Sequence, residues 1–383
     1  MSLKSRIERK IHVGNRTLGM GEPIFLTAEI GAAHCGSIEN AKIMIKAAAD
    51  AGCDGCDIFM CSDYAAEFYH RNTKNGHNFV QDWHDLYFTP DQWRELIAYG
   101  EANNVIVYPT PLDRVSLRVC RELGVKMINV NSDDVNNILF LEDAGKLGIP
   151  VTMHDIDQTI SEVEGAVKTL IANGAAGVTV LHSTLETGDD EYGYATANLE
   201  VIRTYDQAFG ALGALAGCVE HTTSDFLIYA VAAYRPVLIS KHIQIDNSNP
   251  HDTSISVKTA DLKRMIKNVR MVEKALGDGQ NQRAINADGS IPMRSRNKVL
   301  VAARDIPAGK VVTRDDIDAR RPGDYGGLHP WNARLIVGAK TTRALKRNEI
   351  LSLNMFSDFP DVDYKFPETH DYKLHANSKV VAV

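Results

Sequence analysis

The fold of this chain is decided by two stretches, ALAGCVEHT at residues 214–222 and VLISKH at residues 237–242. Each is a short apolar run that ends in chemically competent side chains. They are the last of eight strand-like runs, each followed by a helix-like run, that fill residues 24–277. Short β-type runs alternating with helices of about ten to fifteen residues indicate a parallel sheet. Eight such units favour a closed (β/α)₈ barrel over an open doubly wound sheet.

The first six strand-like runs are similarly short and apolar. The turn after the first of them, Ala33-His34-Cys35-Gly36, lacks the G-x-G-x-x-G pattern of a phosphate-binding open sheet. The last helical segment stops at Gly277-Asp278-Gly279, a typical C-terminal signal. We therefore expect a barrel domain over residues 1–277. The six runs are residues 24–33, 53–60, 105–109, 126–130, 150–154 and 178–182.

The pattern changes beyond the barrel. Residues 278–297 are polar and rich in Asn, Gln, Arg and Gly, so they are predicted to be a linker. Residues 298–356 contain short β-type runs, among them 299–303 and 335–337, which predicts a small β-rich domain. Residues 357–383 form a polar tail without a structural prediction.

Composition limits the kind of protein. The chain has 383 residues, of which 44% are hydrophobic and 24% charged, as in ordinary globular proteins. A net charge of -7 without a basic run argues against nucleic-acid binding. No apolar stretch approaches the ~20 residues of a membrane span, and the N-terminus lacks a signal-peptide core. The six scattered cysteines suit a reducing compartment, so we expect a cytoplasmic protein.

Two histidines end the last two strands. Neighbouring parallel strands lie about 4.8 Å apart, so His221 and His242 can share one metal ion at the end of the barrel where active sites form. Two imidazoles leave positions for substrate oxygens and water, which suits Mn²⁺ or another divalent ion such as Mg²⁺. The alternative is two unrelated histidines that each bond a backbone carbonyl.

Three strand motifs resemble one family. Ala28-Glu29-Ile30-Gly31 with His34, then Val219-Glu220-His221-Thr222, then Ser240-Lys241-His242 are similar to motifs of the sialic acid synthases. That family includes the pseudaminic and legionaminic acid synthases and related spore-coat polysaccharide proteins. Residues 299–309 resemble its antifreeze-like (SAF, β-clip) domain, and the similarity spans roughly residues 20–356.

The resemblance implies a reaction. It implies condensation of phosphoenolpyruvate with a sugar-like aldehyde, in nonulosonic acid or surface polysaccharide biosynthesis, with the metal on His221 and His242. Glu29 takes the place of the family's first-strand acid, and we expect Glu29 and Lys241 to be catalytic. The resemblance also implies a homodimer with exchanged SAF domains, in which Arg321 reaches the partner's substrate.

The chain departs from the family where the phosphate should bind. The family's lysines on strands two and four are replaced here by Asp57 and Asn129. Either another cation has moved in, with Lys241, Arg114 and His154 as candidates, or the donor is no longer phosphoenolpyruvate. The predicted substrate-binding residues are Asp57, Thr110, Asn129, Ser132, His154, Ser183 and Arg321.

Two alternatives therefore stay open beside the synthase. One is an aldolase, lyase or dehydratase of the same fold that does not use phosphoenolpyruvate. The other is a sugar-binding protein without catalytic activity.

Overall fold

The computed structural model describes residues 9–62, 84–184, 191–246, 251–277, 298–321 and 327–361. Two compact units make up the chain, Met1–Gly279 and Gln280–Val383. The predicted linker at 278–297 lies outside the described residues, as does the tail from residue 362 onward.

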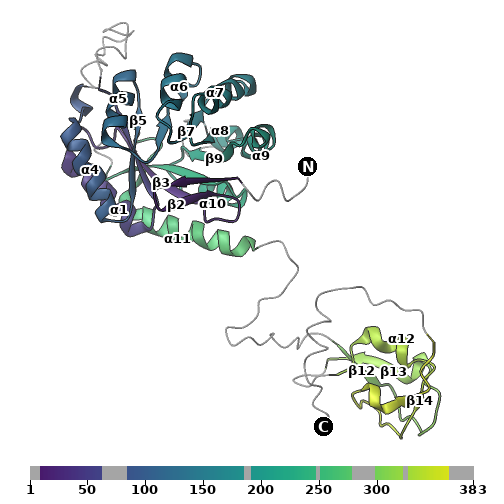
Figure 1. Ribbon diagram of the computed structural model, residues 1–383. Coiled ribbons are helices and arrows are strands. Elements are labelled where there is room, and N and C mark those ends of the chain that lie inside the picture. The colour runs from purple at the N-terminus through teal and green to yellow at the C-terminus, as the bar shows by residue number, and fades with distance from the viewer. Residues whose placement is uncertain are drawn as a thin grey trace. The chain divides into compact units, whose positions relative to one another are not determined.

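The first unit is a nearly closed barrel of parallel strands (Figure 1). In the described residues its strands follow the order β5-β4-β3-β10-β9-β8-β7-β6. This confirms the predicted (β/α)₈ architecture, and every predicted run falls on a strand. The strands are β3 (Phe25–Gly31), β4 (Gly55–Met60), β5 (Ile106–Pro111), β6 (Ile128–Val130), β7 (Pro150–Asp155), β8 (Gly177–Ser183), β9 (Leu215–Glu220) and β10 (Leu238–Gln244).

Helices surround these strands and bury their apolar sides against the outer face of the sheet (Figure 1). Capping residues at their N-termini determine where several of these helices begin. The Ser37 side chain caps α1, and Thr89 forms a capping box with Gln92 at the start of α4. The helices are α1 (Ile38–Ala51), α4 (Pro90–Ala102), α5 (Arg114–Leu123), α6 (Ile138–Gly145), α7 (Ile160–Ala172), α8 (Glu191–Thr196), α9 (Glu200–Phe209), α10 (Phe226–Ala233) and α11 (Thr259–Leu276). None of the described helices is long and apolar enough to cross a membrane.

The barrel has a seam between β5 and β6. These strands lie side by side, but no backbone ladder joins them. Side chains bridge the seam instead, since Asn129 Nδ2 on β6 donates to Thr110 Oγ1 on β5 at 3.0 Å. The bridge falls at the carboxyl ends of the strands, where the predicted substrate residues lie.

An N-terminal hairpin, absent from the sequence-based prediction, packs on the opposite end of the barrel. It consists of β1 (Lys10–Val13) and β2 (Arg16–Gly19), paired antiparallel. Its Ile11 packs against Gly177 so closely that a Cβ there would lie 2.6 Å from an Ile11 carbon. The hairpin thus completes an apolar layer inside this end of the barrel. The polar inner side chains lie at the other end, where the strands have their carboxyl ends. That layer contains Ile11, Val13, Leu18, Phe25, Tyr108, Met127, Leu181, Leu215, Val219 and Leu238.

The second unit contains the predicted β-rich domain, a small β fold with its own core. Strand β12 (Val299–Ala302) pairs antiparallel with β13 (Ile317–Arg320), and β14 (Lys340–Thr341) with β15 (Phe356–Ser357). The prediction of a β run at 335–337 is wrong, because Leu335 and Ile336 lie in the short helix α12 (Ala333–Ile336) that packs into this core. The core contains Leu300, Ala302, Ile306, Val312, Ile336, Ala339, Leu345, Leu351 and Phe356.

Candidate functional site

Polar side chains converge at the carboxyl ends of the barrel strands. Successive residues of a strand point to opposite faces, so every second side chain of each strand points into the barrel. At its apolar end this face holds the hairpin layer, and at its other end it becomes polar. All of the following inner residues are buried: Glu29, Asp57, Thr110, Asn129, His154, Ser183, His221 and His242.

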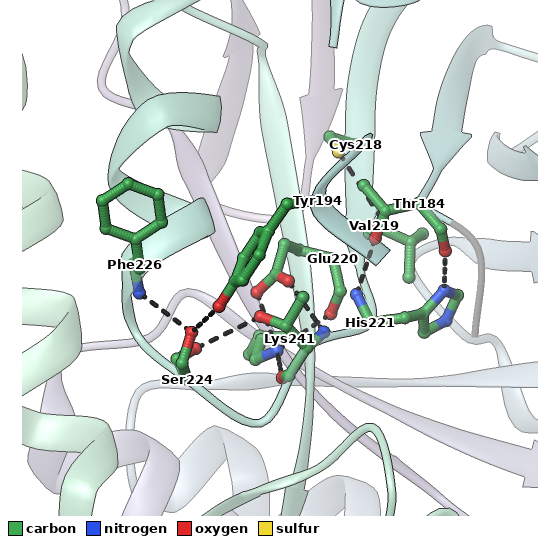
Figure 2. A network of polar contacts seen from close by, with 10 residues as sticks. Thr184, Tyr194, Cys218, Val219, Glu220, His221, Ser224, Phe226 and Lys241 are labelled. Atoms are coloured by element: carbon green, nitrogen blue, oxygen red, sulfur yellow. Dashed lines mark hydrogen bonds and ion pairs between the residues drawn. The ribbon is translucent and has the colours of Figure 1, made fainter. Parts of the chain in front are cut away.

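The two histidines lie together, with ring centroids 5.1 Å apart. His221 Nδ1 lies 2.6 Å from the Thr184 carbonyl oxygen and donates to it, which leaves Nε2 with its lone pair (Figure 2). Burial and the neighbouring His242 lower the pKa of His221 to about 4. The ring is therefore neutral near pH 7, the state that binds metals, and the carbonyl bond fixes its orientation.

Glu29 joins this pair from the adjacent strand. Its Oε1 lies 3.3 Å from His242 Nε2, and its Oε2 accepts a hydrogen bond of 2.8 Å from Ser240 Oγ. A β-bulge between Glu29 and Gly31 interrupts the register just beyond this contact. Bulges often redirect side chains beside active sites. Here the bulge follows Glu29 directly, where β3 turns into the loop above the site.

The histidine pair fits a divalent metal that keeps open positions. In the described part of the chain no group of three or more His, Cys, Asp or Glu is placed to hold a metal. Two imidazoles beside one carboxylate still provide suitable donors, and an open site takes its remaining ligands from substrate and water. His221 and His242 are the residues that would hold the ion.

A chain of hydrogen bonds crosses strands β4 to β7 beside the histidines. The Thr110 hydroxyl donates to Asp57 Oδ1 at 2.7 Å, and Asn129 Nδ2 donates to Thr110 Oγ1 at 3.0 Å. Asn129 Nδ2 also lies 3.1 Å from His154 Nδ1, while Thr152 donates to Asn129 Oδ1 at 2.9 Å. Because the amide donates, His154 Nδ1 accepts and the His154 proton sits on Nε2.

The ionisable groups of this chain have shifted pKa values. Burial lowers the pKa of His154 to about 4, so its ring is neutral near pH 7. Burial, and after it the charge of Glu29, raises the pKa of Asp57 well above its usual value. The predicted phosphate half of the site thus holds a carboxyl group and neutral polar groups.

Lys241 lies on the other side of the sheet. It stands between Ser240 and His242 on β10, so alternation turns it toward the helices. Its Nζ lies 2.7 Å from Glu220 Oε2 and 3.1 Å from the Glu220 carbonyl (Figure 2). It also contacts the Thr222 carbonyl. Among the described residues it is the single buried lysine or arginine. The structure therefore places this predicted catalytic residue outside the polar cluster.

Of the remaining predicted residues, the two serines are buried and the two arginines are exposed. The Ser183 hydroxyl is buried on the inner face of β8 and has no hydrogen-bond partner among the described residues. Ser132 is buried in the turn η2 (Ser132–Asp134), just after β6. Arg114 is exposed on α5, where its Nε pairs with Asp143 at 2.7 Å. Arg321 is exposed at the end of β13 in the second unit.

Four residues of the site have no role in the sequence-based prediction. Ser240 could have been found, because it lies two positions before His242 and so shares its face. Thr152 and Thr184 act through bonds to residues of other strands, and no local pattern indicates them. Asp252 Oδ2 lies 4.0 Å from His242 Nδ1, from the segment that follows β10.

Comparison with known proteins identifies the family. A model described as the NeuB family matches residues 44–281, and a SAF domain model matches residues 297–357. The chain is 26% identical over 337 residues to an N,N'-diacetyllegionaminic acid synthase of Campylobacter jejuni, covering 85% of this chain and 98% of the relative. It is 27% identical over 354 residues to the N-acetylneuraminate-9-phosphate synthase of Homo sapiens, covering 88% and 93%.

A solved structure shows the same fold. The spore coat polysaccharide biosynthesis protein SpsE of Bacillus subtilis aligns with a TM-score of 0.62 at 22% identity, over 91% of this chain and 99% of that one. The NeuB model alone spans more than half of the chain, and the SAF model matches the residues that follow it. The chain therefore belongs to the NeuB family.

Proposed function

We propose that this protein is a metal-dependent synthase that forms a carbon–carbon bond to a sugar-like aldehyde. The observation that carries the proposal is the buried pair of His221 and His242, with Glu29 against it, at the active end of the barrel. The curated relatives support it, because their names are those of sialic and legionaminic acid synthases.

Each residue has a role in this proposal. His221 and His242 would hold a divalent ion, Mn²⁺ or Mg²⁺, and that ion would supply a Lewis acid for the aldehyde oxygen. Glu29 moves a proton near that oxygen, and Ser240 orients Glu29 through its 2.8 Å bond. The side chains of Thr110, Asn129 and His154 bind the second substrate.

Phosphoenolpyruvate is the donor that the family resemblance implies, and the described barrel interior provides poor support for it. A unit charge at 4 Å contributes about 4 kcal/mol at an effective dielectric constant of 20. Asp57 in place of a lysine removes that attraction for a phosphate, and the carboxylate form of Asp57 would repel it. This observation favours the second candidate function, an aldolase-type enzyme of the same fold with a different donor.

Metal binding and turnover test the proposal together. Titration of the metal-free protein with Mn²⁺, followed by electron paramagnetic resonance, should show one site that His221→Ala and His242→Ala each abolish. His12→Ala is the matched control, because His12 is an exposed histidine of the N-terminal hairpin.

Turnover is measured with a panel of aldoses and three-carbon donors, and the products are detected by mass spectrometry. The proposal expects an added three-carbon acid that depends on the metal. Metal binding unaffected by both histidine variants, or sugar binding without any product, would contradict it and leave the sugar-binding alternative.

A further inference from the structure

We propose that a cavity at the end of the barrel opposite the histidine pair binds a small phosphate monoester. The cavity has a volume of about 710 Å³, within the range of small-molecule pockets. It lies between the loop after β2, the helices α9 and α11, and the loop that joins α10 to β10. The inference is independent of the proposed function, because none of the eight buried inner residues of the polar site lines this cavity.

The barrel strands separate the cavity from the polar site. Leu215 lines the cavity and begins β9, whereas His221 directly follows the last residue of that strand. Six extended residues at about 3.3 Å each put the two positions about 20 Å apart. Val237 also lines the cavity and directly precedes β10, the strand that carries His242. A small ligand in the cavity therefore occupies a place of its own and does not reach the histidine pair.

Ion pairs and backbone contacts hold the walls of the cavity in place. Arg9 pairs with Asp206 of α9 at 3.0 Å. Arg270 of α11 pairs with Glu273 at 2.8 Å and donates to the Ile24 carbonyl, just before β3, at 2.7 Å. These contacts join the start of the N-terminal hairpin to α9, and α11 to β3. Walls that are fixed before binding lose little conformational freedom when a ligand arrives.

The lining of the cavity carries a surplus of positive charge. Five of its side chains are cationic and three are acidic, in a chain whose net charge is -7. Two of the acids are the partners described above, and the third, Glu22, pairs with Lys10. Among the cations, Arg203 pairs with a glutamate of its own helix. Two cations remain, Arg235 and Lys274, which have no carboxylate partner among the described residues.

Arg235 has a backbone conformation that favours glycine. Its φ is 55°, in the left-handed region, which is costly for a residue with a side chain. A glycine at this place, just after α10, would avoid that cost. The Arg235 Nη2 donates to the carbonyls of Leu276, at 2.9 Å, and Gly277 at the end of α11. Within the described residues Nε and Nη1 have no partner, so two sides of the guanidinium can still donate to a ligand.

A phosphate monoester matches this combination of charge and surface. Its charge is about -2 at pH 8, equal and opposite to that of the two cations without carboxylate partners. A guanidinium and an ammonium provide the charge-assisted donors that bind phosphate oxygens. Apolar side chains make up much of the remaining lining, among them Ile24, Ile202 and Val237, and they can cover the organic part of the ester. Sugar phosphates and nucleoside monophosphates share this chemistry.

Chemical protection of Lys274 tests the site in the unaltered full chain. The metal-free protein is treated briefly with an acetylating reagent at pH 8, and mass spectrometry measures the acetylation of each lysine. The probes are glucose 6-phosphate, cytidine 5'-monophosphate, inorganic phosphate and glucose. We expect one of the two esters, at ten times its Kd, to slow the acetylation of Lys274 about tenfold, and glucose to have no effect. Lys263, an exposed lysine about three turns earlier on α11, should react equally fast throughout.

Calorimetry with variants then locates the binding. Arg235→Gly and Lys274→Gln should each weaken the binding of the same ester about tenfold or more, because each removes a charged hydrogen-bond donor. Lys263→Gln removes one charge from the same helix outside the cavity, so it should bind like the wild type. Circular dichroism establishes that the variants fold, and Arg235→Gly also relieves the left-handed strain.

Three results would overturn this inference. The first is acetylation of Lys274 at an unchanged rate with both esters at millimolar concentration. The second is unchanged affinity in the folded Arg235→Gly and Lys274→Gln variants, which would place the ester elsewhere. The third is inorganic phosphate that binds as tightly as either ester, since the apolar walls would then contribute nothing. All three leave the Mn²⁺ test of His221 and His242 untouched, so the proposed function would still stand.

Discussion

Lys241 and Glu220 form a buried ion pair behind the two strands that carry the histidines. Their charged atoms lie 2.7 Å apart, and the two side chains are 1% and 0% exposed. Glu220 precedes His221 and Lys241 precedes His242, so the pair ties β9 to β10 from the helix side. The Lys241 ammonium also contacts the backbone carbonyl on either side of His221.

Removal of Lys241 is therefore expected to act on stability. Lys241→Met leaves Glu220 buried without its partner, which costs about 3–5 kcal/mol of the free energy of unfolding. Urea denaturation measures this loss. Lys46→Met is the control, because Lys46 pairs with Asp50 on the exposed face of α1 and should change stability by less than about 1 kcal/mol. A fully stable Lys241→Met protein with no turnover would instead support the catalytic role predicted from the sequence.

Acid should destabilise the barrel through His34. Burial lowers the pKa of this histidine to about 3, below its usual value of 6.5. The folded state therefore holds His34 neutral, and its full contribution is present above pH 6.5. As the pH falls from 6.5 toward 3, the unfolded chain takes up a proton that the folded chain refuses, and stability drops by about 1.4 kcal/mol per pH unit.

Thermal unfolding between pH 7 and pH 4 measures this effect. His34→Asn can keep the acceptor for the Gly36 amide and should lower the slope by about 1.4 kcal/mol per pH unit, while the buried His154 and His221 keep their own contributions. His12→Asn, at an exposed site, should keep the wild-type slope. An unchanged slope in the His34 variant would show that other groups cause the acid sensitivity.

Phosphoenolpyruvate binding should be gained by a double substitution. Asp57→Lys with Asn129→Lys removes one buried carboxylate and adds two cations where the family has lysines. We expect the affinity for phosphoenolpyruvate to rise at least about tenfold, as one added charge at short range contributes up to about 4 kcal/mol. Isothermal titration measures it, with circular dichroism to establish that the variant folds. Tight binding by the unchanged protein would mean that a cation outside the described residues already serves the phosphate.

The SAF domain should act across a homodimer. Arg321 is exposed, and the family resemblance predicts that it reaches the partner's substrate. Light scattering should give twice the mass of the 42.2 kDa chain. Arg321→Ala should raise the KM for the aldehyde about tenfold without changing that mass, whereas Arg314→Ala, also exposed, should alter neither. A monomer with full activity would exclude this role.

Much of the architecture follows from local signals along the sequence. The alternation of short apolar runs with capped helices predicts the barrel. The two-residue repeat of a strand and the 3.6-residue repeat of a helix can be recognised without knowledge of distant contacts. The same alternation puts His221 and His242 at the ends of consecutive strands. It also separates Lys241 from His242, since adjacent residues of a strand face opposite sides, and the catalytic role of Lys241 stays a prediction.

Only the tertiary structure decides how distant side chains pair. The bond between Asn129 and Thr110 across the seam, and the bond between Thr110 and Asp57, depend on the relative register of strands far apart in sequence. The packing of Ile11 beneath the barrel likewise depends on where the chain's first hairpin docks. The identity of the residues at the mouth of the barrel is therefore a property of the sequence. Whether the Asp57 carboxyl group is ionised, and so repels a phosphate, is decided by the neighbours that the fold brings to it.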